Sequence, residues 1–193
     1  MTSIALANLH AFAVAALSGV EDGEPLGPVD TALIRMGVVA SVTALDKDAV
    51  QTAIESAIHA GATPAQIQEV ASLVSGLGVH SLMATALPIA RAAGIECTPL
   101  SPEQQALWDK YVGVDPFWHG FEVEFPGFLG ALLRLSCDQF ATFFDYCAVP
   151  WKSGMVRGAL KELIAMACDA TPAHRFGPGF RLHLVNAIKL GVG

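Results

Sequence analysis

The sequence contains LIRMGVVA at residues 33–40 and, 130 positions later, LIAMACDA at residues 163–170. The same offset links a second pair of stretches, AIHAG at residues 57–61 and AIKLG at residues 187–191. A constant offset without gaps indicates an internal duplication rather than a chance similarity between alanine-rich helices. The chain is therefore predicted to contain two copies of one structural unit.

Each copy is expected to consist of a helix, a short connection and a second helix. In the first copy, apolar residues recur at helical spacing over residues 32–45 and 48–60. Gly61 is expected to end the second helix, because glycine adopts the left-handed conformation there at little cost. Thr63-Pro64, followed by Gln66, has the pattern of a capping box that starts a further helix.

The predicted fold class is all-α, because only residues 112–114 and 121–125 have even weak strand character. We expect a first repeat over residues 1–95, an aromatic- and proline-rich linker over 96–127, and a second repeat over 128–193. The second copy stops soon after its final glycine. It is therefore expected to lack its last helices.

Composition favours an oligomer. Apolar residues make up 53% of the chain and charged residues 15%, so part of the apolar surface is expected to be buried between subunits. The alternative is an alanine-rich core, because alanine also tolerates exposed helix faces. We predict a homo-oligomer. Its interface would include the apolar helix at residues 4–17, which would cover the second repeat of a partner chain.

Charge and targeting signals limit the partners. The net charge is −7, and no basic stripe suits nucleic acid, although the more basic C-terminal part suits a small carboxylate-bearing ligand. The apolar run at residues 4–20 has no preceding basic residue and is too short to span a membrane comfortably. We expect a cytoplasmic protein without a membrane partner. Its four cysteines have neither C-x-x-C nor metal-ligand spacing, so we expect no metal site.

Two longer motifs resemble one family. AIHAGATPAQIQEV at residues 57–70 and TPAHRFGPGFRLHLVNAIKLG at residues 171–191 are similar to the repeat signatures of the carboxymuconolactone decarboxylase family. The resemblance implies an AhpD-like helical bundle built from two tandem repeats. Because members of the family form rings of three or six subunits, it also implies a homo-oligomer in which a trimer is preferred to a dimer. Its peroxidase branch, typified by alkylhydroperoxidase D, carries two cysteines where this chain has Phe176 and Gly179. Without a vicinal thiol pair, thiol-based peroxide reduction at this site is excluded.

The resemblance also identifies candidate site residues, all in or near the second repeat. The first repeat has Ala53 and Ala32 where the second has His183 and Glu162. A helix that only packs can carry alanine at such positions, so one site per chain is expected. Alternatives remain open, because an isolated histidine in a helix is often structural and an acid near a helix start is favoured by the dipole alone. The candidates are His183, His174 and Glu162 for catalysis, and Arg181, Trp118, His119 and Trp151 for substrate binding.

The family implies a function in the degradation of aromatic compounds. We expect a lyase that needs no cofactor and decarboxylates a small unsaturated lactone or a similar ring-cleavage product, with His183 as proton donor. His174 or Arg181 would bind a carboxylate or the enolate oxygen. The alternative is a catalytically silent protein of the same fold that binds a small ligand or serves in assembly.

Overall fold

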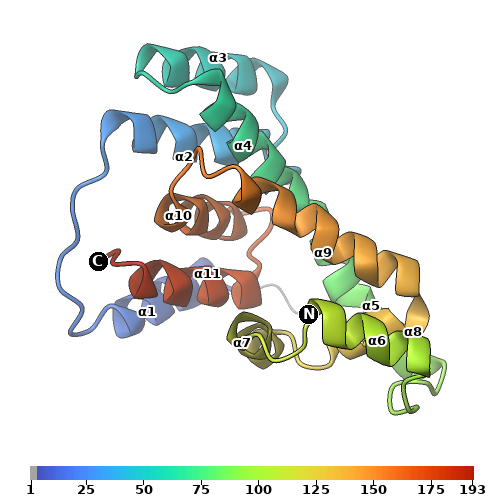
Figure 1. Ribbon diagram of the computed structural model, residues 1–193. Coiled ribbons are helices and arrows are strands. Elements are labelled where there is room, and N and C mark those ends of the chain that lie inside the picture. The colour runs from blue at the N-terminus through green and yellow to red at the C-terminus, as the bar shows by residue number, and fades with distance from the viewer. Residues whose placement is uncertain (1–3) are drawn as a thin grey trace. The chain divides into compact units, whose positions relative to one another are not determined.

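The computed structural model describes residues 4–193, and these residues form helices, turns and loops without a strand (Figure 1). The all-α prediction is confirmed, and the two segments with weak strand character are helical or in turns. The chain divides into two compact units. The first comprises the chain up to Leu77 together with Val149–Gly193, and the second comprises Gly78–Ala148.

The duplication is visible in the first unit as two equivalent helix pairs. The first pair is α2 (Pro28–Ala40) and α3 (Lys47–His59), and the second is α10 (Gly158–Asp169) and α11 (Gly177–Lys189). The starts of α2 and α10, and both ends of α3 and α11, differ by 130 positions. The two-repeat prediction is therefore confirmed at the level of the helices.

The connections repeat as well as the helices. The described residues other than glycine that have positive φ are Leu45 and Arg175, which are again 130 positions apart. Each lies just before the second helix of its repeat. The hydroxyl groups of Ser41 and Thr171 each donate a hydrogen bond to a carbonyl three residues earlier. The two copies thus share a backbone path as well as an apolar pattern.

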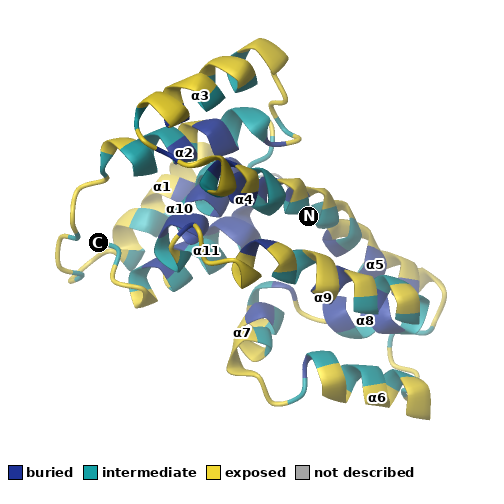
Figure 2. Ribbon diagram, turned by 45° about the horizontal axis from the view of Figure 1, so that its top comes forward, coloured by how far each residue is buried: buried dark blue, intermediate teal, exposed yellow. Residues whose placement is uncertain are grey.

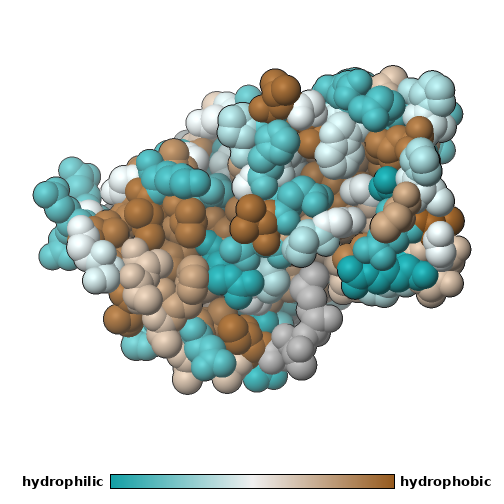
Figure 3. Space-filling model, turned by 90° about the horizontal axis from the view of Figure 1, so that it is seen from below, coloured by the Kyte–Doolittle hydropathy of each residue, from teal (hydrophilic) through white to brown (hydrophobic). Residues whose placement is uncertain are grey.

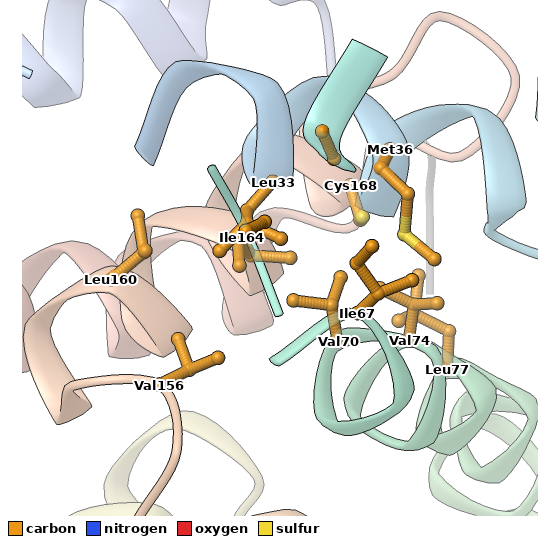
Figure 4. Close-up of a cluster of buried hydrophobic side chains, with 12 residues drawn as sticks. Leu33, Met36, Ile67, Val70, Val74, Leu77, Val156, Leu160, Ile164 and Cys168 are labelled. Atoms are coloured by element: carbon orange, nitrogen blue, oxygen red, sulfur yellow. The ribbon is translucent and has the colours of Figure 1, made fainter. Parts of the chain in front are cut away.

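The core of the first unit lies where α2, α10 and α4 (Pro64–Ser75) pack together. Figure 4 shows their buried side chains pointing toward one another, and α10 is among the most buried helices in Figure 2. The helices approach closely at Gly37, where an added Cβ would lie 2.7 Å from Ile164 Cγ2. The predicted capping box starts α4, since Thr63 and Gln66 each bond the other's backbone N–H.

A buried ion pair joins α4 to α10. Glu69 Oε1 lies 2.5 Å from Lys161 Nζ, and the two side chains are 4% and 3% exposed. The Glu69 carboxylate also accepts hydrogen bonds from the backbone N–H groups of Met155 and Val156. Although burial raises the pKa of Glu69, these bonds together with Lys161 outweigh burial and lower it. The pair therefore fixes the chain segment that leads into α10.

Helix α1 (Leu6–Ala16) packs against α11 of its own chain. Leu9 is buried there against Phe180 and Leu184. The N-terminal helix thus covers the second repeat of its own chain, whereas we expected it to cover the second repeat of a partner chain. Other apolar side chains of α1 remain exposed, among them Val14 at 58%, and Figure 3 shows apolar surface among polar patches on the side that carries α1.

The second unit contains α5 (His80–Ala92), α6 (Pro102–Tyr111), α7 (Pro116–Glu124), α8 (Phe128–Leu135) and most of α9 (Cys137–Lys152). Buried aromatic side chains of α7, α8 and α9, namely Phe121, Phe128 and Phe143, contact one another in its core. The segment expected to be a linker thus contributes two helices, α6 and α7. Because α5 packs against α8, helices expected in different repeats belong to one compact unit.

Residues 64–92 include α4 and α5 and, by length and composition alone, form the one described helical stretch that could cross a membrane. The stretch has 29 residues, and an 18-residue window within it has a mean hydropathy of 1.6. In its α4 part, however, Val70 and Val74 are buried in the core and Glu69 is buried in its ion pair. These contacts are typical of a core helix.

Candidate active site

The structure brings Glu162 and His183 together from the two helices of the second repeat. Glu162 lies in the second turn of α10, and His183 lies in the middle of α11. Glu162 Oε2 is 2.6 Å from His183 Nδ1, and Asn186 Nδ2 lies 3.4 Å from the other carboxylate oxygen. With the Glu162 side chain 6% exposed and the His183 side chain 22% exposed, the imidazole keeps limited access to solvent.

The surroundings of His183 favour its protonated form. Burial alone lowers the pKa of His183, because an imidazolium loses hydration there. The hydrogen bond and charge of Glu162, together with the charge of Asp169, outweigh burial and raise the pKa above its ordinary value. The side chain is therefore suited to hold a proton near neutral pH and to release it to a bound molecule.

Asp169, which the sequence analysis did not select, lies between two histidines. Its side chain is 1% exposed at the end of α10. His183 Nε2 is 3.9 Å from one carboxylate oxygen, and His174 Nε2 is 3.5 Å from the other. Burial raises the pKa of Asp169, and the two histidines offset part of this effect. The sequence contains one signal for Asp169: it is an acid at the position where the first repeat has the apolar Val39.

At Gly179, one of the two positions where the peroxidases carry a cysteine, the structure leaves no room for a larger side chain. An added Cβ at Gly179 would overlap Asp169 Oδ2 and would lie 2.7 Å from Phe176 Cδ1. Gly179 thus leaves space that the Asp169 carboxylate fills. The one cysteine of this unit, Cys168, is buried, and burial raises its pKa to about 12. At neutral pH a thiol with this pKa is almost entirely protonated and is a poor nucleophile. This agrees with the exclusion of thiol-based peroxide reduction in the sequence analysis.

His174 and Arg181 occupy different settings. His174 lies in the turn between α10 and α11 and stacks on Phe176, with 5.3 Å between ring centroids. Pro178 and Gly179 both lie in the first turn of α11, where proline is well tolerated. Arg181 therefore belongs to the helix, and its guanidinium lies 5.9 Å from the ring centroid of Phe12 in α1.

The predicted aromatic contacts are divided between the two units. Trp151 belongs to the first unit, where Lys161 Nζ lies 5.2 Å from its ring centroid. Trp118 and His119 belong to α7 in the second unit. There Trp118 makes an edge-on contact with Phe144, with ring centroids 4.6 Å apart. A role for these three residues in substrate binding stays a prediction.

The equivalent region of the first repeat is an apolar groove. Ala32 and Ala53 stand at the positions of Glu162 and His183 and help to line a groove of about 1080 Å³ along α2 and α3. The groove offers no histidine and no buried acid among its lining residues. Groups that can transfer a proton therefore occur at these paired positions only in the second repeat.

Comparisons with known proteins agree with this architecture. No protein-family model matches the sequence, and no curated protein matches it. A solved structure from Burkholderia xenovorans LB400, described as a "putative gamma-carboxymuconolactone decarboxylase subunit", is similar with a TM-score of 0.71 and 27% sequence identity. The match covers 97% of this chain and 73% of that one. In fold and repeat pattern, the chain thus resembles the carboxymuconolactone decarboxylase family, as a two-repeat form without the cysteine pair.

Proposed function

We propose that the protein is a lyase that decarboxylates a small carboxylated unsaturated lactone, or a similar ring-cleavage product, without a cofactor. The observation that carries the proposal is the hydrogen bond of 2.6 Å between Glu162 and His183. This pair is found in the second repeat, whereas the first repeat has two alanines at the same positions. The similarity to the Burkholderia protein supports the same class of reaction.

The proposed reaction has two steps. First, the bond between the carboxylate carbon and the substrate breaks, and its electron pair moves through the conjugated system to the lactone carbonyl as carbon dioxide leaves. His183 then donates a proton to carbon, which restores the carbonyl, and solvent returns a proton to the imidazole. The net change is the exchange of one carboxylate for one hydrogen. A positioned general acid accelerates such a step by about 10² to 10⁴-fold.

The neighbouring residues have distinct roles in this proposal. Glu162 accepts the Nδ1 proton of His183, so that Nε2 is the atom that delivers a proton to the substrate. His174 or Arg181 supplies positive charge or a hydrogen-bond donor for the substrate carboxylate or the developing enolate oxygen. Trp151, which belongs to the same unit, is proposed to contact the apolar part of the substrate.

The test is carbon dioxide release from a panel of carboxylated unsaturated lactones. His183→Ala is expected to lower kcat by about 10² to 10⁴-fold, because the general acid is lost. Glu162→Gln is expected to lower kcat less, because the imidazole is retained without its charged partner. His59→Asn, on the equivalent helix of the first repeat, is the matched control and should leave kcat unchanged.

Circular dichroism of each variant checks that the helices are intact. If His183→Ala turns over as fast as the wild-type protein, His183 is not the proton donor. If the wild-type protein binds a panel compound and returns it unchanged, it is instead the silent ligand-binding member of the fold. Peroxide turnover that depends on any one of the four cysteines would contradict the exclusion of thiol chemistry.

A further inference from the structure

We propose that Asp169 is a positioning residue of this site, whose carboxylate occupies the space left by Gly179 and orients the Nε2 atoms of His183 and His174. The inference rests on the proposed function, since it concerns the residue taken as the proton donor. It also extends that function, because neither the sequence motif nor the similarity to the Burkholderia protein identifies Asp169.

The first argument is the placement of the carboxylate. An ionised carboxylate with 1% exposure is costly unless its oxygens face positive or hydrogen-bonding groups. Its two oxygens face two different histidines, at 3.5 Å from His174 Nε2 and 3.9 Å from His183 Nε2. The Asp169 carboxylate thus lies close to both imidazoles of the site, those of His174 and His183.

The second argument is the space that the carboxylate fills. At Gly179, an added Cβ would overlap Asp169 Oδ2, so the aspartate can keep its position only with glycine there. The equivalent positions in the first repeat are Val39 and Ala49. The acid and the glycine therefore occur together in the second repeat and are both replaced in the first.

The third argument concerns His183 itself. Its Nδ1 is bound to Glu162, so its ring is held at one end from α10. A second carboxylate opposite Nε2 restricts rotation of the ring and favours the proton on the atom that delivers it. The distance of 3.9 Å leaves Nε2 without a short bond to Asp169, so the proton is not committed to that carboxylate.

The ionisable groups near α11 come from the two elements packed against it. Helix α10 contributes Glu162 and Asp169, and its Lys161 is paired with Glu69. Helix α1 contributes only His10, which is exposed. The turn between the two helices contributes His174 and Arg175, and α11 itself carries Arg181 and Lys189. Among these groups, Glu162 and Asp169 are the two acids that face His183.

The test is a pH titration of the histidine side chains in the full-length protein, monitored by ¹⁵N NMR of the imidazole nitrogens. In Asp169→Asn, the midpoint for His183 is expected to move down by about 1 pH unit or more, because a nearby negative charge is removed. The pH-rate profile of carbon dioxide release should shift likewise, with kcat lowered at neutral pH and KM little changed.

A second variant tests the same contact with the acid still present. Gly179→Ala is expected to displace the carboxylate and to lower the His183 midpoint. Its control is Gly158→Ala, where the nearest neighbour would be Leu190 Cδ1 at an ordinary 3.7 Å. The control for Asp169→Asn is Asp48→Asn, at an exposed position of α3. Neither control should move the midpoint.

The outcomes separate this inference from the proposed function. An unchanged His183 midpoint in Asp169→Asn overturns the inference even if the wild-type protein releases carbon dioxide. If Asp169→Asn does not fold, the His183 midpoint in Gly179→Ala alone decides whether the inference holds. A loss of thermal stability without a change in midpoint would mean a purely structural role, and would also overturn it. Absence of decarboxylation by the wild-type protein would instead count against the proposed function, and the titration would still test Asp169.

Discussion

At the scale of single residues, the protonation of His183 links the candidate site to stability. Burial lowers its pKa, but Glu162 and Asp169 outweigh burial, so the folded-state pKa lies above the unfolded value. A raised pKa stabilises the fold fully below the unfolded pKa, about 6.5, and this contribution is lost as the pH rises through the folded pKa. The Glu162–His183 pair should therefore stabilise the protein most in mildly acidic solution.

We predict that Glu162→Gln lowers the free energy of unfolding by about 1.5–3 kcal/mol at pH 6, the usual range for a hydrogen bond to a charged group. The loss should be smaller at pH 9, because less of the imidazole is protonated there. Urea unfolding at the two pH values measures it. Glu55→Gln, which alters an exposed bond to Gln51, is the control. Equal losses at both pH values would show that the pair is not linked to protonation.

At the scale of helices, the buried Glu69–Lys161 pair joins α4 to α10. We predict that Lys161→Met lowers the free energy of unfolding by about 3–5 kcal/mol, because it leaves the Glu69 charge buried without its partner. Glu69→Gln combined with Lys161→Met should lose less, because no uncompensated charge remains. Chemical denaturation of the single and double variants measures the coupling.

The control for this prediction is the exposed pair between Arg91 and Glu96. Arg91→Met should lose less than about 1 kcal/mol, because solvent screens an exposed pair. The lowered pKa of Glu69 means that its contribution is present above the unfolded pKa and lost as the pH falls. A loss from Lys161→Met no larger than that from Arg91→Met would be evidence against a stabilising connection between α4 and α10.

At the scale of the whole molecule, we predict a homo-oligomer, with a trimer preferred to a dimer. The chain is 53% apolar, and every residue of α1 except Asn8 and His10 is apolar, although the helix packs one face on α11. A helix of this kind is usually buried on more than one side. Light scattering at micromolar concentration should give a multiple of the 20.2 kDa chain mass. A mass equal to one chain would rule out this assembly.

The helices and their duplication are recoverable from local sequence. Apolar spacing, the capping box at Thr63 and the glycine at position 61 act within one or two turns of chain, so their effect can be read without knowing the fold. Comparing the two copies also singled out Glu162 and His183, because each replaces an alanine of the first repeat. A repeat provides its own reference for such a comparison.

The role of Asp169 and the division into units depend instead on contacts between distant residues. Asp169 acts through the space left by Gly179 on another helix, and in the sequence it is one acid at the end of an apolar helix. Similarly, α5 belongs with α8 because their side chains pack together, whereas sequence order assigns them to different repeats. Local patterns specify which residues form helices, but burial and steric fit arise only when helices meet.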